Sequence, residues 1–199
     1  MAEQRALRPR DAWWIAAGTA AAIALFAWRA TGAASWSWQW SWQWSWALGA
    51  VGYAGFGALS VALAMIDART LRLPNRLLLA AGIWLTVWLV PAALALGEPA
   101  RLGWAALAAL LFFVLFAGLW LCWGPAFFGG GDAKLAPICG FAVAWIGLGA
   151  VLIFPFAVAV ATLPGLVSAL RNRERQLAYG PSLLIAAWLA IAFPAEWVL

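Results

Sequence analysis

The sequence contains no histidine, and this absence excludes several kinds of active site. Ser-His-Asp triads, Cys-His pairs, HExxH zinc proteases and haem ligation by histidine all need an imidazole. The sequence also has no GxSxG elbow, no Walker A motif and no paired-glycine dinucleotide fingerprint. A serine-based intramembrane protease and a nucleotide-binding enzyme therefore have no support.

Cysteine is almost absent as well. The two that are present, Cys122 and Cys139, both fall within apolar segments. Two isolated thiols without CxxC spacing cannot form a four-ligand zinc site. We expect both to be buried free cysteines and predict no metal site.

Charged residues are scarce, at 10% of the chain, whereas 67% of the residues are hydrophobic. Soluble domains are about 45–50% apolar and about 25% charged, so this composition predicts an integral membrane protein. A spanning helix needs roughly 20 apolar residues. The sequence predicts an all-α, polytopic membrane helix bundle of six to seven transmembrane helices, in a single domain over residues 1–199. Six segments qualify or come close, and a seventh is short: 12–28, 47–66, 77–96, 103–122, 150–170 and 182–198, with 134–148 as the short one.

The net charge of +5 suggests a nucleic-acid partner only until the positions of the charges are considered. If the N-terminus is cytoplasmic and 134–148 is a span, only Arg29 and Arg101 of the 12 basic residues lie outside. This is the positive-inside asymmetry of membrane proteins. The charge therefore predicts a multi-pass protein of the cytoplasmic (inner) membrane whose partner is the lipid bilayer, and no nucleic acid.

The N-terminal part of the chain is unusual. Residues 1–27, a basic stretch followed by an apolar one, would fit a cleaved signal peptide, but we expect an uncleaved first helix. In residues 35–46, six tryptophans alternate with Ser or Gln. Because tryptophan favours the headgroup region, we interpret this repeat as an interfacial belt in an external loop. The alternative is an aromatic ligand-binding box.

Two of the seven acidic residues, Asp67 and Asp132, lie where apolar segments meet short loops on the same predicted side of the membrane. A carboxylate at the bilayer edge is costly and needs a reason. Two aspartates held close cannot both ionise easily, and a shared proton lets one activate water while the other protonates a carbonyl oxygen. The sequence therefore indicates a catalytic carboxylate pair suited to peptide hydrolysis.

Structural interpretations of the same residues stay open at this point. Asp132 follows three glycines and would also suit a routine helix start, near a favourable helix N-terminus. Asp67 would also suit an ion pair with Arg69 or Arg72. Lys134 lies two residues from Asp132 and is expected to snorkel to headgroups rather than to catalyse.

Three separated segments carry a resemblance to a known family. Asp67 is followed seven residues later by Pro74-Asn75, Gly129 to Leu135 reads GGGDAKL, and Tyr179-Gly180-Pro181 opens the last predicted helix. The chain resembles the type IV prepilin peptidases, which are GxGD-type intramembrane aspartic proteases. The likeness spans roughly residues 50–195.

This resemblance implies a prepilin leader peptidase, an aspartic endopeptidase that cleaves pilin-like precursors at the cytoplasmic face, just before their hydrophobic segment. It maps the catalytic pair to Asp67 and Asp132 and implies neither metal nor organic cofactor. It further implies that some neighbouring residues position the substrate: Gly129, Gly130, Gly131, Lys134, Pro74, Asn75, Gly180 and Pro181.

The chain also departs from the larger bifunctional members of the family. Those members carry a cysteine-bearing cytoplasmic region and methylate the new amino terminus; this chain lacks that region, so methyltransferase activity is not expected. Its size resembles the short members that serve tight-adherence (Tad/Flp) pili. Residues 1–46 form a divergent N-terminal part and 47–199 the catalytic helix bundle. Two alternatives are a small carboxylate-dependent ion or proton transporter and a non-catalytic pilus or secretion assembly factor.

Overall fold

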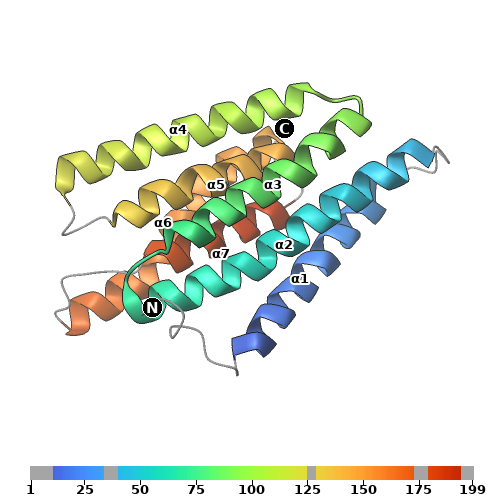
Figure 1. The fold of residues 1–199 in the computed structure, drawn as a ribbon. Helices are drawn as coiled ribbons and strands as arrows, with labels where there is room; N and C mark the ends of the chain where they lie inside the picture. The colour runs from blue at the N-terminus through green and yellow to red at the C-terminus, as the bar shows by residue number, and fades with distance from the viewer. Residues whose placement is uncertain (1–10, 34–39, 125–128, 173–178, 194–199) are drawn as a thin grey trace.

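The computed structural model describes residues 11–33, 40–124, 129–172 and 179–193 of the chain. Within these ranges every regular element is an α-helix, and seven helices follow the predicted segments, including the short one at 134–148, which is α5. Their bounds are α1 Asp11–Ala33, α2 Trp40–Thr70, α3 Asn75–Ala95, α4 Ala100–Trp123, α5 Gly130–Ile146, α6 Leu148–Asn172 and α7 Tyr179–Ala192 (Figure 1).

Four stretches of the described helices are long and apolar enough to cross a membrane by length and composition. They are Trp44–Thr70, Asn75–Ala95, Ala100–Cys122 and Leu148–Ser168. Leu110, Val114 and Leu121 of α4 are more than half exposed, as expected for side chains that meet lipid rather than water. The chain is a helical membrane bundle, as the composition predicts.

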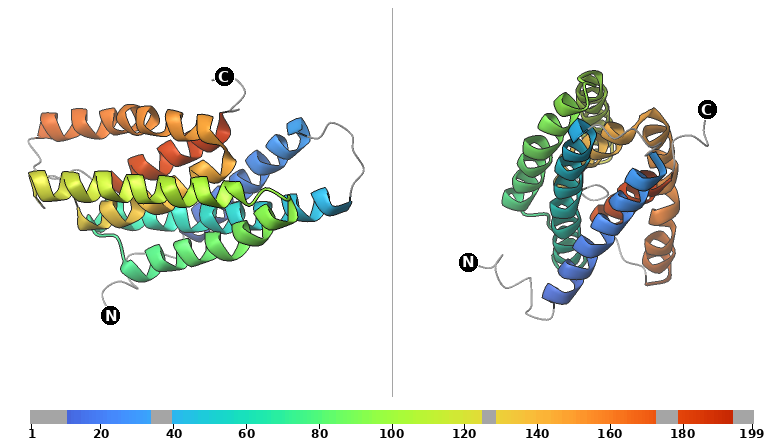
Figure 2. Two further views of the ribbon diagram at one scale, coloured as in Figure 1. Left: turned by 90° about the horizontal axis from the view of Figure 1, so that it is seen from above. Right: turned by 90° about the vertical axis from the view of Figure 1, so that its right-hand side faces the viewer.

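Successive helices run in alternating directions, so their ends gather at two opposite ends of the bundle. The end of α2, the start of α3, the end of α4 and the start of α5 meet at the left of Figure 1 and again in the view from above in Figure 2. We call this the aspartate end, because it carries Asp67 and Asp132. Arg101, at the start of α4, lies at the other end. Which end faces the cytoplasm stays a prediction.

Two buried aromatic residues join the helices that carry the aspartates. The Tyr53 hydroxyl of α2 donates a hydrogen bond of 2.6 Å to the Ala142 carbonyl of α5. The Trp145 indole N–H of α5 donates one of 3.1 Å to the Leu89 carbonyl of α3, and the rings of Tyr53 and Trp145 meet edge to face. Because lipid offers no hydrogen-bond partners, such polar tips must be satisfied inside the bundle. These contacts set α5 against α2 and α3.

Helix α1 crosses α2 obliquely in both figures and packs closely against it. A Cβ added at Gly18 would lie 2.2 Å from Val61 Cγ2, and one at Gly57 would lie 2.7 Å from Ala22 Cβ. Small residues at such crossings let membrane helices approach closely. The divergent N-terminal helix is therefore packed into the bundle through glycine contacts.

Two local expectations were wrong. Residues 40–46 of the tryptophan repeat are not a loop but the first turns of α2, while 34–39 lie outside the described residues. In a helix the backbone N–H and C=O groups bond to one another, as they must next to lipid. In a loop the same groups would have to bond to water. Cys122, which was expected to be buried, is exposed near the end of α4, whereas Cys139 is buried. At the start of α3, Asn75 is the first helical residue and Pro74 holds the cap position with extended backbone.

Candidate active site

Asp67 lies in the last turn of α2 and is buried, with 5% of its surface exposed. The backbone N–H of Gly180, in the first turn of α7, donates a hydrogen bond of 3.1 Å to Asp67 Oδ2. A helix's first N–H groups have no partner within the helix and favour a negative charge. The start of α7 therefore holds the Asp67 carboxylate in place.

Gly180 is needed for that contact. A Cβ at this position would lie 2.6 Å from Asp67 Oδ2, closer than real Cβ contacts come, and 3.0 Å from Asp67 Cγ. Any other residue would push the carboxylate or the helix away. Pro181 follows in the first helical turn, where its fixed φ and missing N–H are tolerated, as the sequence predicts.

Asp132 lies in the first turn of α5 and is also 5% exposed. Its Oδ2 accepts a hydrogen bond of 3.2 Å from the Gly129 N–H, and its own N–H donates one of 3.0 Å to the Gly129 carbonyl. Asp132 therefore does stabilise a helix start, as one structural interpretation predicts. This contact uses one of the two carboxylate oxygens, so the Asp132 side chain can have a second role besides stabilising the helix.

The electrostatics link the two carboxylates. Asp132 precedes the apolar run of α5 and lies outside the four candidate spans. Burial, and next the negative charge of Asp67, raise the pKa of Asp132 to about 7, against the lowering effect of the Gly129 hydrogen bond. Burial, and next the negative charge of Asp132, raise the pKa of the Tyr179 phenol. Asp67, Asp132 and Tyr179 thus lie within electrostatic reach of one another.

Arg69, which the sequence offered as an ion-pair partner for Asp67, forms its ion pair with Asp11. Its guanidinium donates two hydrogen bonds, of 2.5 and 3.0 Å, to the carboxylate oxygens of Asp11. Asp11 is buried at the start of α1, and Arg69 follows Asp67 by two residues. This bidentate pair ties α1 to the end of α2.

The three glycines before Asp132 differ in their surroundings. A Cβ at Gly131 would lie 2.8 Å from the Cβ of Leu73, so this glycine lets the start of α5 pack against the α2–α3 loop. Gly129 and Gly130 are exposed. Their accessible backbone agrees with the expected approach of a substrate, which stays a prediction.

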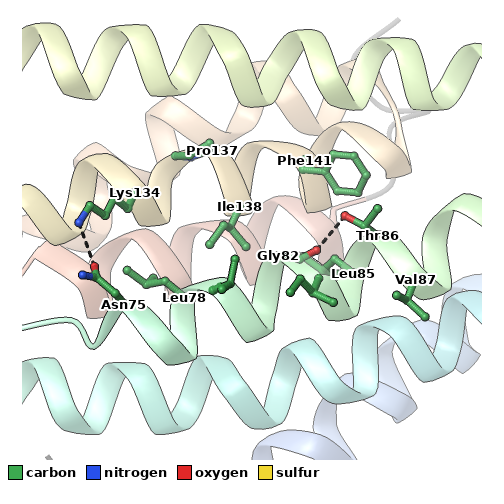
Figure 3. Close-up of a pocket in the computed structure, with 12 residues that line it drawn as sticks. Asn75, Leu78, Gly82, Leu85, Thr86, Val87, Lys134, Pro137, Ile138 and Phe141 are labelled. Carbon is green, nitrogen blue, oxygen red and sulfur yellow. Dashed lines mark hydrogen bonds between the residues drawn. The ribbon is translucent and has the colours of Figure 1, made fainter.

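Lys134 lies on a different face of α5 from Asp132. It is exposed, and its Nζ donates a hydrogen bond of 2.9 Å to Asn75 Oδ1 at the start of α3. Both residues line one end of a groove of about 730 Å³ between α3 and α5 (Figure 3). Pro74, just before Asn75, is buried. The hydrogen bond between Lys134 and Asn75 fixes the start of α3 against α5. Neither side chain contacts the Asp67 or Asp132 carboxylate in the interactions that the structure shows.

The structure therefore brings Asp67, Asp132 and Gly180 together at one end of the bundle and leaves Lys134 and Asn75 at its side. Tyr179 belongs to the Tyr179-Gly180-Pro181 segment but was not predicted as a site residue. Its position next to Gly180 was the available signal. The Asp11–Arg69 pair had no signal in the sequence, because its members are 58 residues apart.

Comparison with known proteins adds a family. The sequence profile of the type IV leader peptidase family matches residues 53–170, more than half of the chain. The match includes both Asp67 and Asp132 and ends before α7, so Gly180 falls outside it. No curated protein and no solved structure matches the chain.

Proposed function

The chain belongs to the type IV leader peptidase family, and we propose that it is a prepilin leader peptidase of the aspartic type. The observation that carries the proposal is the pair of buried carboxylates, Asp67 and Asp132, held at one end of the bundle and coupled by charge. They come from helices α2 and α5, which 59 residues of sequence separate, and they lie at the same end of the bundle because the chain returns to that end.

The proposed chemistry follows from one proton shared by two carboxyl groups. The ionised carboxylate takes a proton from water, whose oxygen attacks the carbonyl carbon of the scissile peptide bond. The protonated carboxyl gives its proton to the carbonyl oxygen. When the tetrahedral intermediate collapses, the C–N bond breaks and the leaving amine takes a proton from the pair. A hydroxyl of the intermediate returns its proton to the pair as the new carboxyl group forms, so the pair again holds one proton. The dyad titrates as a unit, so neither residue receives a fixed role.

The substrate class follows from the family and from the place of the pair. A leader peptidase removes a leader, and the substrates proposed here are pilin-like precursors whose short basic leader precedes a hydrophobic segment. We place the aspartate end at the cytoplasmic face of the inner membrane, since Arg69, Arg76 and Lys134 gather there and Arg101 lies at the other end. The chemistry needs no metal or organic cofactor.

The position of the two acids also separates this proposal from the transporter alternative. Transporters place their binding groups near mid-bilayer in broken helices. Here Asp67 lies in the last turn of α2 and Asp132 in the first turn of α5. Both positions suit a peptide bond presented at the membrane surface.

The test uses the full-length protein in proteoliposomes with pilin-like precursors, and mass spectrometry locates any cut. The native protein is expected to cut between the basic leader and the hydrophobic segment. Asp11→Asn is the matched control, because Asp11 is another buried aspartate of the same protein that does not belong to the pair. It is expected to retain cleavage, whereas Asp67→Asn is expected to abolish it. Ion flux without any cleavage would contradict the proposal.

A further inference from the structure

Helices α1, α2 and α7 enclose a second cavity of about 450 Å³ that the proposed chemistry does not use. Its walls are apolar, and α1 and α2 contribute small residues to them, namely Gly18, Ala22 and Gly57. Ile185 and Leu189 of α7, which also line it, are 53% and 41% exposed. The cavity is therefore open towards the surroundings of the bundle and too small for a whole helix, but it accepts a few side chains.

One polar group in this cavity has no partner. Ser60 lines the cavity and is 4% exposed. Its Oγ has no hydrogen-bond partner within the described part of the chain. A buried hydroxyl without a partner destabilises a protein, so such a group calls for an explanation. An occupant with a hydrogen-bonding group would provide one.

The cavity lies close to Asp67, although Asp67 itself does not line it. Ser60, Ala64 and Asp67 follow at spacings of four and three residues, so they share one face of α2. On α7 the cavity is lined by Pro181, the neighbour of the Gly180 that binds Asp67. Helical rise places Ser60 about 10 Å from Asp67 along the axis. An extended peptide covers that distance in roughly three residues.

Resting on the proposed function, we infer that this cavity receives the start of the precursor's hydrophobic segment, with Ser60 donating a hydrogen bond to a backbone carbonyl a few residues beyond the cut. An acyl chain of a lipid would fill apolar space equally well, but it has no acceptor for the Ser60 hydroxyl. A peptide that is extended for cleavage has free backbone carbonyls. The groove between α3 and α5, described above, is the competing docking site for the precursor (Figure 3).

The first experiment is a kinetic comparison of Ser60→Ala with Thr86→Ala in proteoliposomes. Thr86 lines the competing groove, and its hydroxyl already donates to the Gly82 carbonyl at 2.8 Å. Loss of the Ser60 hydrogen bond is expected to raise KM for the precursor about three- to tenfold, with kcat unchanged. The melting temperature of Ser60→Ala is expected to equal or exceed that of the native protein, because an unpartnered buried hydroxyl is removed. An unchanged KM would overturn the inference.

The second experiment locates the precursor directly. A photo-crosslinking amino acid is placed at Ile185 or, as a control, at Ile83 of the competing groove; the two side chains are 53% and 54% exposed. Both crosslinking variants also carry the substitution Asp67→Asn, so that the bound precursor is not cut. Crosslinking of precursor at Ile185 but not at Ile83 supports the inference. Crosslinking at Ile83 alone, or to lipid alone at Ile185, overturns it. If the native protein cuts no pilin-like precursor, the proposed function itself fails, which is a separate result.

Discussion

The backbone N–H of Gly180 donates a hydrogen bond to the carboxylate of Asp67 across 113 residues of sequence. This contact joins the start of α7 to the end of α2, and it lies partly outside the segment matched by the family profile. The last helix is therefore part of the proposed active site and not only a wall of the bundle.

Gly180→Ala is the sharpest local test of this contact. The added Cβ would lie 2.6 Å from Asp67 Oδ2, so the carboxylate or α7 must shift. A misplaced catalytic group is expected to lower kcat/KM for precursor cleavage about 100-fold. Gly82→Ala is the matched control, since the nearest atom to its Cβ is Ile138 Cγ1 at 4.0 Å, and it is expected to cleave normally. Equal activity of the two variants would contradict this role of Gly180.

Cleavage should depend on pH through the proton of the pair. The pKa of Asp132 is raised to about 7, so its carboxyl carries a proton below that pH and loses it as the pH rises. Above about pH 7 the pair becomes doubly ionised and lacks its acid, and kcat/KM is expected to fall roughly tenfold per pH unit. A pH–rate profile of the reconstituted protein measures this limb. A rate that climbs steadily up to pH 9 would be inconsistent with a shared proton.

The Asp11–Arg69 pair should matter for stability more than for chemistry. Arg69→Ala leaves the buried Asp11 carboxylate without its bidentate partner, so the melting temperature is expected to fall. Arg69→Lys retains the charge but not the two-pronged geometry and should lie between that variant and the native protein. Arg72→Ala, at an exposed neighbouring position, serves as the control and should melt like the native protein. A larger loss for Arg72→Ala would exclude this assignment.

Lys134 belongs to the segment Gly129 to Leu135 that resembles the family, yet its side chain donates a hydrogen bond to Asn75 on the side of the bundle. Lys134→Ala removes one exposed hydrogen bond and is expected to change kcat/KM by about threefold or less. The measurement is precursor cleavage in parallel with Gly131→Ala, where the new Cβ would meet Leu73 and disturb the start of α5. Loss of activity on Lys134→Ala at the level of an aspartate variant would show a direct catalytic part.

The sequence predicted the helices well, because a long apolar run between charged loops satisfies its backbone hydrogen bonds in lipid by forming a helix. The short segment 134–148 became α5 with its first turn at Gly130, and so Asp132 lies inside a helix and not in a loop. The sequence also singled out both aspartates, since carboxylates at the ends of apolar segments are rare. The structure buries both at one end of the bundle, and their catalytic role stays a prediction. The family match contains both.

The rest depended on packing that spacing alone does not reveal. Nothing in the sequence indicated that Arg69 pairs with Asp11, because the oblique crossing of α1 over α2 decides that contact. The unpartnered hydroxyl of Ser60 was equally hidden, since a serine in a helix usually bonds back to its own backbone. The repeat at 40–46 was misjudged because its alternation of tryptophan with polar residues has no helical period.

The central claim, that Asp67 and Asp132 act as one unit, is tested most directly by single and double substitution. The rate constant for precursor cleavage is measured for Asp67→Asn, Asp132→Asn and the double variant, with insertion in the membrane verified for each. Each single variant is expected to lose about 1,000-fold or more, and the double variant no more than either, because groups that act together are not additive. Full cleavage by either single variant, or losses that multiply in the double variant, would contradict the account.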